Sequence, residues 1–219
     1  MNFVQTLTAV EKSRALSCAI RFLLAAILSG SQIFGAYAPF GLGFVAAAGA
    51  GMEGLSALLG LLVGALLMMP FTAAIKYIAA AILIFSVSVA FFDTKLYRKH
   101  AFLPLITAAC TAVVGFVYLM PQGVFNTDGA YFLLEIFLAG GCAVCYRMAL
   151  AIQIDAPETL ERQQLFALFV LAISLLIAVA AIPLAGRFSL GRIFSIVLVL
   201  AAGRLGGMVW AAPPDCALA

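Results

Sequence analysis

The stretch that decides the fold is Ala36–Ala50, which reads AYAPFGLGFVAAAGA. It joins one apolar run, Ile20–Gly35, to a second apolar run that is too short for an ordinary membrane span. At 1.5 Å per residue the second run is roughly 21 Å long, against a hydrocarbon core of roughly 30 Å. We therefore expect two helical pieces that meet at a turn formed by Pro39, Gly41 and Gly43. The remaining helices are expected to pack around this pair.

The composition is typical of a membrane protein. Of the 219 residues, 66% are hydrophobic and only 10% are charged, whereas a soluble domain carries about 25% charged residues. A soluble fold of this size could not bury so much apolar surface, so the expected solvent and first partner is the lipid bilayer. The net charge is +3, and the basic residues are spread over short loops. This pattern argues against nucleic acid as a partner.

Hydropathy divides the chain into a cytoplasmic lead-in over residues 1–16, a transmembrane helical domain over 17–211 and a short tail over 212–219. The expected fold class is all-α, a polytopic membrane bundle of about eight spans. The first residues lack a basic leader before an apolar core, so we expect no cleavable signal peptide. The expected spans are Leu16–Gly35, the short Pro39–Gly51, Gly54–Met69, Phe71–Phe92, Ala101–Met120, Gly129–Leu150, Leu165–Leu184 and Leu190–Trp210.

Basic residues predict the orientation. Lys12 and Arg14 place the N-terminus in the cytoplasm, and the three basic residues of Asp93–His100 place that loop there too. An even number of crossings must separate the two, so the short helix is expected to cross the plasma membrane of a bacterium. Basic residues in the last loop break the rule, so the topology of residues 165–210 stays open. Four tyrosines near the predicted outer face form an expected aromatic belt: Tyr37, Tyr77, Tyr118 and Tyr131.

Small residues at a spacing of four predict close helix packing. Gly60 and Gly64 have this spacing in the third expected span, and Gly203 and Gly207 have it in the eighth. In apolar helices such pairs let two backbones approach closely. Packing within the chain is the favoured interpretation, and self-association through these glycines is the alternative.

Two charged residues fall inside expected spans. Glu135 lies about two turns into the sixth span, and Lys76 lies about one turn into the fourth span from the same outer side. A carboxylate in hydrocarbon is costly unless it faces protein or water. The matching depths predict a Lys76–Glu135 ion pair inside the bundle. The alternative is a carboxylate that binds a proton or a cation in a solute path.

The five cysteines are odd in number and mostly lie in apolar segments, which does not indicate a disulfide framework. Cys142 and Cys145 have the C-x-x-C spacing of a redox or metal pair. Such sites usually have a second pair or a supporting histidine, and the one histidine, His100, lies in another loop. We therefore interpret these cysteines as small hydrophobic residues and predict no metal site and no cofactor.

Three stretches between Arg21 and Arg147 resemble one known family. An apolar helix that begins at Arg21 leads into the Pro-Phe-Gly turn and an alanine-rich helix that ends at Ala48. Further along are Lys76–Leu83, which reads KYIAAAIL, and Leu134–Gly141, which reads LEIFLAGG. Together they resemble the membrane region of stage II sporulation protein E.

This resemblance implies a multi-span membrane region of about ten helices, followed in the family by a manganese-dependent serine/threonine phosphatase domain. The phosphatase activates the forespore sigma factor. The membrane region anchors the protein at the polar septum, where the next region contacts a cell-division protein. No manganese-binding aspartate of that domain has a counterpart here, so the resemblance assigns no catalytic residue to this chain. The expected role is a membrane anchor that self-associates.

A carrier of small molecules is the alternative function, such as the substrate-binding membrane subunit of a vitamin uptake system. A carrier needs a polar pocket, and Glu135, Lys76, Gln32 and Asn126 are the material for one. A membrane-embedded enzyme is a third hypothesis, but the expected spans contain no cluster of acid, base or metal-binding residues.

Overall fold

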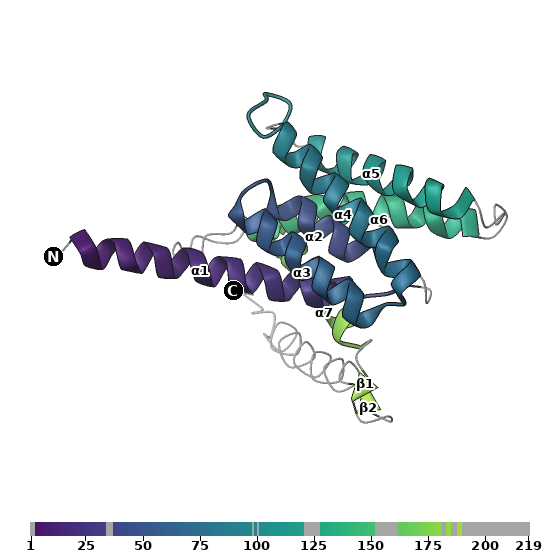
Figure 1. The fold of residues 1–219 in the computed structure, drawn as a ribbon, viewed down its shortest axis with the longest axis horizontal. Coiled ribbons are helices and arrows are strands. Elements are labelled where there is room, and N and C mark those ends of the chain that lie inside the picture. The colour runs from purple at the N-terminus through teal and green to yellow at the C-terminus, as the bar shows by residue number, and fades with distance from the viewer. Residues whose placement is uncertain are drawn as a thin grey trace, which may run out of the picture.

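The computed structural model describes residues 3–33, 37–97, 99, 101–120, 128–151, 162–180, 183–184 and 188–189. These residues form a bundle of helices (Figure 1), with one short pair of two-residue antiparallel strands near the end. The elements are α1 (Phe3–Ser29), α2 (Pro39–Ala48), α3 (Met52–Met68), α4 (Phe71–Ala90), α5 (Phe102–Leu119), α6 (Asp128–Leu150), α7 (Arg162–Ala180), β1 (Pro183–Leu184) and β2 (Phe188–Ser189).

The helical, membrane-type fold class is as predicted, but the number of spans is not established. Within the described residues, four helices are long and apolar enough to cross a membrane: α4, α5, the Gly129–Leu150 part of α6, and α7. Helices α2 and α3 are apolar but shorter. The expected eighth span, Leu190–Trp210, lies outside the described residues.

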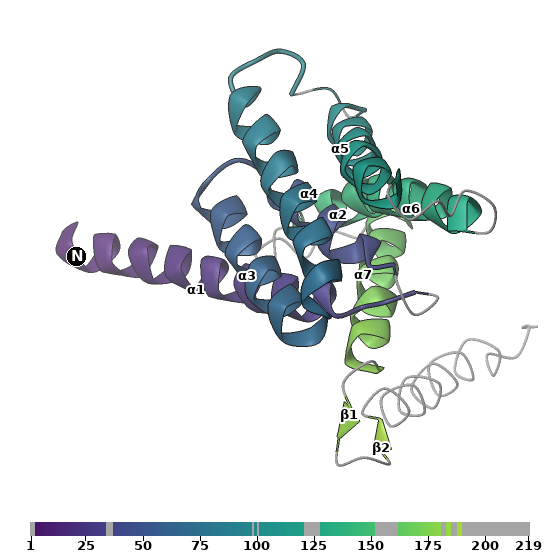
Figure 2. The same cartoon turned by 45° about the vertical axis from the view of Figure 1, so that its right-hand side comes forward.

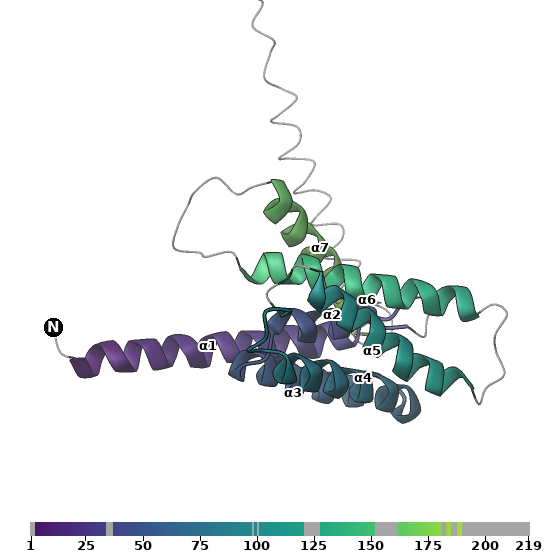
Figure 3. The same ribbon diagram turned by 90° about the horizontal axis from the view of Figure 1, so that it is seen from above.

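Helix α1 begins earlier than the sequence pattern predicts. The expected lead-in over residues 1–16 is helical from Phe3 onward, and Figure 3 shows this N-terminal part extending beyond the other helices. Neither glycine nor proline interrupts Phe3–Ser29, so polarity alone does not stop the helix. The helix ends at Ser29, before the expected end at Gly35. The next residue, Gly30, donates its backbone N–H to the Ile27 carbonyl at 3.1 Å.

Helices α1 and α3 run in the same direction and in close contact. A Cβ at Gly60 would overlap the backbone of Phe22, and a Cβ at Gly64 would overlap that of Ala26. A step of four residues along α3, from Gly60 to Gly64, matches a step of four residues along α1, from Phe22 to Ala26, so the two helices are parallel. The chain between two parallel helices must run back in the opposite direction.

Helix α2 is that returning segment. Its first turn lies against the end of α1, since Gly41 approaches Ser29. Its last residue lies against the middle of α1, since Arg21 donates to the Ala48 carbonyl at 3.2 Å. Helix α2 therefore runs antiparallel to α1 and α3. Figures 1 and 2 show it in the middle of the bundle. Its 10 residues span about 15 Å.

Helix α2 is the most enclosed element of the described bundle. Nine of its ten residues are buried, and it contacts α1, α3, α4, α5 and α6. Pro39 starts it with a fixed φ and no N–H to satisfy. Gly49 ends it with φ 84°, a conformation that glycine adopts at little cost. Phe44 at its centre is fully buried.

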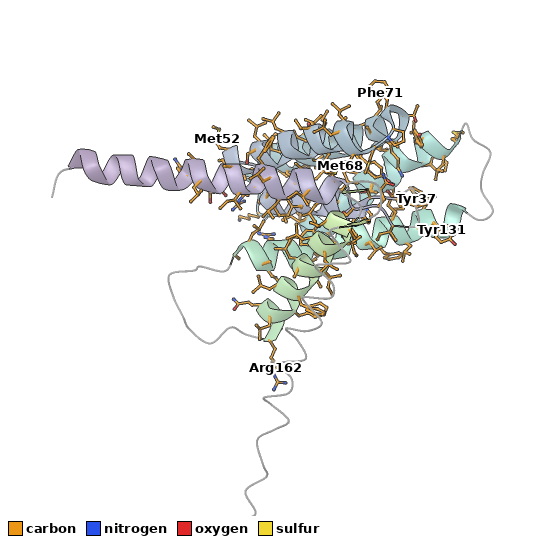
Figure 4. The ribbon with its side chains drawn as sticks, turned by 90° about the horizontal axis from the view of Figure 1, so that it is seen from below. Tyr37, Met52, Met68, Phe71, Tyr131 and Arg162 are labelled. Carbon is orange, nitrogen blue, oxygen red and sulfur yellow. The ribbon has the colours of Figure 1, made fainter. Side chains whose placement is uncertain are left out.

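The bundle has two different ends, which Figure 4 shows. Tyr37, Phe71 and Tyr131 lie towards one end, and Met52 lies towards the other. We call the first the tyrosine end. The second is the basic end. Arg21 pairs with Glu53 there, and Arg147 lies over the ring of Tyr97, in a loop that also carries Lys95 and Lys99.

Candidate functional site

The structure brings Lys76 and Glu135 together inside the bundle. Lys76 Nζ lies 2.7 Å from Glu135 Oε2. The Glu135 side chain is 0% exposed and that of Lys76 is 7% exposed. The pair joins α4 to α6, which run parallel here, so the two residues meet at one depth. A pair this deeply buried has lost its hydration, and its attraction must offset a large desolvation cost.

Tyr77 completes the site, which we call the charged centre. Its hydroxyl donates to Glu135 Oε1 at 2.7 Å and accepts the backbone N–H of Ala38 at 2.9 Å. Each carboxylate oxygen of Glu135 thus receives one strong hydrogen bond. Because Ala38 immediately precedes α2, the same chain of bonds fixes the beginning of the central helix.

Aromatic rings surround the lysine ammonium group. Lys76 Nζ lies 5.0 Å from the ring centroid of Tyr77, 5.1 Å from that of Tyr37 and 5.9 Å from that of Phe132. The face of an aromatic ring attracts a cation, most strongly where water is excluded. The rings therefore stabilise the charge of Lys76 in the place where a carboxylate would be repelled.

The charged centre is closed towards the tyrosine end. Tyr37 and Tyr131 lie there with ring centroids 6.3 Å apart. The narrow gap that they line beside Glu135, together with Pro39, has no room for a water molecule. Among the described residues, this gap leaves a solute no room beside the carboxylate, which is held in an ion pair with Lys76.

A second ion pair holds the other end of α2. Arg21 Nη2 lies 2.6 Å from Glu53 Oε2, while Arg21 Nη1 donates to the Ala48 carbonyl. The cation therefore lies at the C-terminus of α2, and the anion lies in the first turn of α3. Both placements are favourable for the helix dipoles. Helix α2 is thus held by charges at both of its ends.

The glycines predicted to form a turn lie inside α2, which corrects that assignment. Pro39 is its first residue, and Gly41 and Gly43 follow in helical conformation. A Cβ at Gly43 would lie 2.9 Å from Cys142 Cβ and 3.0 Å from the Ala139 carbonyl oxygen. These glycines therefore let neighbouring helices approach, and the actual change of direction lies before Pro39.

The structure also bears on the predicted glycine pairs, the tyrosine belt and the question of a metal site. Gly60 and Gly64 contact α1 within the chain, whereas Gly203 and Gly207 lie outside the described residues. Tyr77 does not belong to an interfacial belt, because it is 2% exposed and faces Glu135. Among the described residues, no group of three or more His, Cys, Asp and Glu side chains could hold a metal ion.

Sequence reasoning missed two parts of this arrangement. It did not assign Tyr77 to the charged centre, although Tyr77 directly follows an intramembrane lysine. It did not pair Arg21 with Glu53, although each lies near an end of an expected helix. The signal for Tyr77 was its place beside an intramembrane lysine, and the signal for Arg21 and Glu53 was a charge near a helix end. The packing of α4 beside α6 and of α1 beside α3 shows which residues meet.

The comparisons with known proteins add no further assignment. No protein-family model, no curated protein and no solved structure matches this chain.

Proposed function

We propose that this chain is a multi-span membrane anchor that self-associates, of the type formed by the membrane region of stage II sporulation protein E. The observation that carries the proposal is the closed charged centre. Glu135 is fully buried, bonded through both oxygens, and next to a gap that cannot hold water. A fixed pair of this kind suits a rigid scaffold, and the gap beside Glu135 leaves no room for a transported solute.

The position of the residues that carry the resemblance supports the same proposal. Arg21, the Pro39–Gly43 stretch, Lys76 and Glu135 all lie around α2. A scaffold built around one central helix requires its charged and small residues to meet there.

The proposed topology has about eight spans with the N-terminus in the cytoplasm. Helices α1 to α6 alternate in direction, so each of them, including the short α2 and α3, counts as one crossing. The tyrosine end would face outward, and the basic end would face the cytoplasm, in agreement with the positive-inside rule. A neighbouring helix or a thinner bilayer would cover the ends of α2.

Localisation and association test the proposal. A fluorescently tagged chain is expressed in a sporulating rod-shaped bacterium, and the purified chain is cross-linked in lipid nanodiscs and in detergent. We expect clustering at the polar septum and cross-linked dimers or larger species. Even fluorescence over the whole membrane together with a strictly monomeric protein would overturn the anchor proposal.

The face that self-associates is expected to exclude the Gly60–Gly64 motif, because α1 already covers it. A Gly51→Ala variant of the tagged chain is a control for the effect of adding a methyl group to a glycine outside the helix contacts, since no atom lies within 4 Å of a Cβ at that position. It should localise and cross-link like the unmodified protein.

A carrier function is the second candidate, favoured by one feature. A groove of about 590 Å³ lies between α4 and α5, with the stem of Lys76 in its wall and Tyr118 at its outer part. Ligand pockets commonly have volumes of about 300–1,000 Å³. Thermal unfolding with a panel of vitamins distinguishes the two functions, because a carrier would be stabilised by its substrate and a pure anchor would not.

A further inference from the structure

Arg147 is a cation without an anion among the described residues. Its Nη1 atom is buried and has no hydrogen-bond partner in the described part of the chain. The ion pairs of the described residues, Arg21–Glu53 and Lys76–Glu135, do not include it. A buried guanidinium nitrogen without a hydrogen-bond partner lowers stability, because it has lost its hydration and gained no bond in return, and this penalty is larger for a charged group than for a neutral one.

The aromatic neighbour of Arg147 does not supply the missing charge. The Arg147 guanidinium carbon lies 6.0 Å from the ring centroid of Tyr97, in the loop that joins α4 to α5. Burial raises the pKa of the Tyr97 phenol above its ordinary value, although Arg147 opposes this shift. The phenol is therefore neutral near pH 7 and offers a ring face to the cation.

Arg147 lines a cavity of about 290 Å³ at the basic end, between the start of α5, the end of α6 and the start of α7. Two glutamines, Gln163 and Gln164, lie beside it in the first turn of α7, and the remaining wall is apolar, including Leu103 and Met148. Side-chain amides and the N-terminus of a long helix both favour an anion. The cavity thus combines a polar part suited to an anion with an apolar part suited to hydrocarbon.

We propose that this cavity binds the phosphate of an anionic phospholipid, with Arg147 as the principal contact. The cavity lies where α5 and α7 begin and α6 ends, which is the depth of lipid headgroups for helices that span the membrane. A guanidinium matches the geometry of a phosphate by paired hydrogen bonds. The apolar wall would contact the first part of the acyl chains, which a free phosphate lacks.

Lipid-dependent stabilisation of the full chain tests this proposal. The purified chain in a nonionic detergent is titrated with dioleoyl phosphatidylglycerol, dioleoyl phosphatidylcholine or inorganic phosphate, and the midpoint of thermal unfolding is measured. We expect phosphatidylglycerol to raise the midpoint well above the value with phosphatidylcholine. We expect inorganic phosphate to have little effect.

Two variants locate the effect. Arg147→Gln should weaken the apparent affinity for phosphatidylglycerol by at least about tenfold, because it removes charge-assisted hydrogen bonds. Lys99→Gln removes one positive charge from an exposed position at the same end and should retain the affinity. If Arg147→Gln does not fold, Gln163→Glu at the exposed edge of the cavity should reduce the preference for phosphatidylglycerol by repelling phosphate.

Three results would overturn the proposal. They are equal stabilisation by the two lipids, equal losses in Arg147→Gln and Lys99→Gln, and full stabilisation by inorganic phosphate. The last result would identify a free anion as the occupant. None of them bears on the anchor proposal, which is tested by localisation and cross-linking.

Discussion

Replacing Lys76 by methionine should be among the most damaging single changes in this chain. The variant keeps the length of the side chain but removes the ammonium group, so Glu135 loses its partner at 2.7 Å. The Tyr77 hydrogen bond to the other carboxylate oxygen remains and cannot neutralise the charge. Removing one partner of a buried ion pair lowers the free energy of unfolding by about 3–5 kcal/mol. For a chain of this size, that corresponds to a fall of about 6–20 °C in the unfolding midpoint.

The double variant Lys76→Met/Glu135→Leu should recover most of this loss. Both charges are then gone, and an apolar pair of similar volume is often as stable as a buried ion pair. The difference between the single and double variants separates the cost of an unpaired carboxylate from the net value of the pair. Each purified variant is heated in detergent, and size-exclusion chromatography measures how much folded protein remains at each temperature.

Lys99→Met is the matched control, because it makes the same chemical change at an exposed position. It should unfold within about 0.5 kcal/mol of the unmodified chain, as surface substitutions usually do. The reasoning is refuted if Lys76→Met behaves like this control, or if the double variant is no more stable than Lys76→Met.

Exchanging the two charges should recover less than the apolar double variant. In Lys76→Glu/Glu135→Lys, a carboxylate would occupy the place where three ring faces surround Lys76 Nζ. Ring faces attract cations and repel anions. Recovery equal to that of the apolar double variant would show that the rings contribute no preference.

Further substitutions test the elements around α2. Tyr77→Phe removes the hydroxyl that bonds to Glu135 and should cost about 1.5–3 kcal/mol in thermal unfolding. Gly64→Leu would overlap the backbone of α1 and should abolish the monodisperse protein in chromatography, whereas Gly141→Leu, with no atom within 4 Å, should be tolerated. Arg21→Gln should cost about 1 kcal/mol, because its pair with α3 is partly exposed; faster proteolysis between α2 and α3 would report it.

The sequence predicted the helices well where hydropathy decides them. The boundaries of α3, α4, α5 and α6 agree with the expected spans to within about two residues, which is the scatter of helix assignment itself. Helix α1 was predicted to begin too late, because hydropathy marks the apolar part of a helix and not its polar continuation. It was also predicted to run to Gly35, whereas it ends at Ser29. The Lys76–Glu135 pair could also be predicted from the sequence, because an intramembrane carboxylate requires a partner at a similar depth.

The sequence did not reveal how the glycines of α2 function. In a linear reading, Pro39, Gly41 and Gly43 indicate a turn, because proline and glycine interrupt helices in water. In the bundle the same glycines allow α1, α3 and α6 to approach a helix that is buried on nearly all sides. Tyr77 was misassigned similarly, because depth in the membrane does not determine whether a side chain faces lipid or protein.

The sequence by itself therefore determined which segments are apolar helices, where most of them begin and end, and that Lys76 and Glu135 need each other. These features depend on local composition and on the cost of polar groups in hydrocarbon, which act residue by residue. Only the tertiary structure decided that α2 runs antiparallel to α1 and α3, which pack directly against each other, that an ion pair lies near each end of α2, and that Tyr77 bonds to Glu135. Those features depend on which helix faces meet, and the many small and apolar side chains of this chain permit several packings with the same hydropathy pattern.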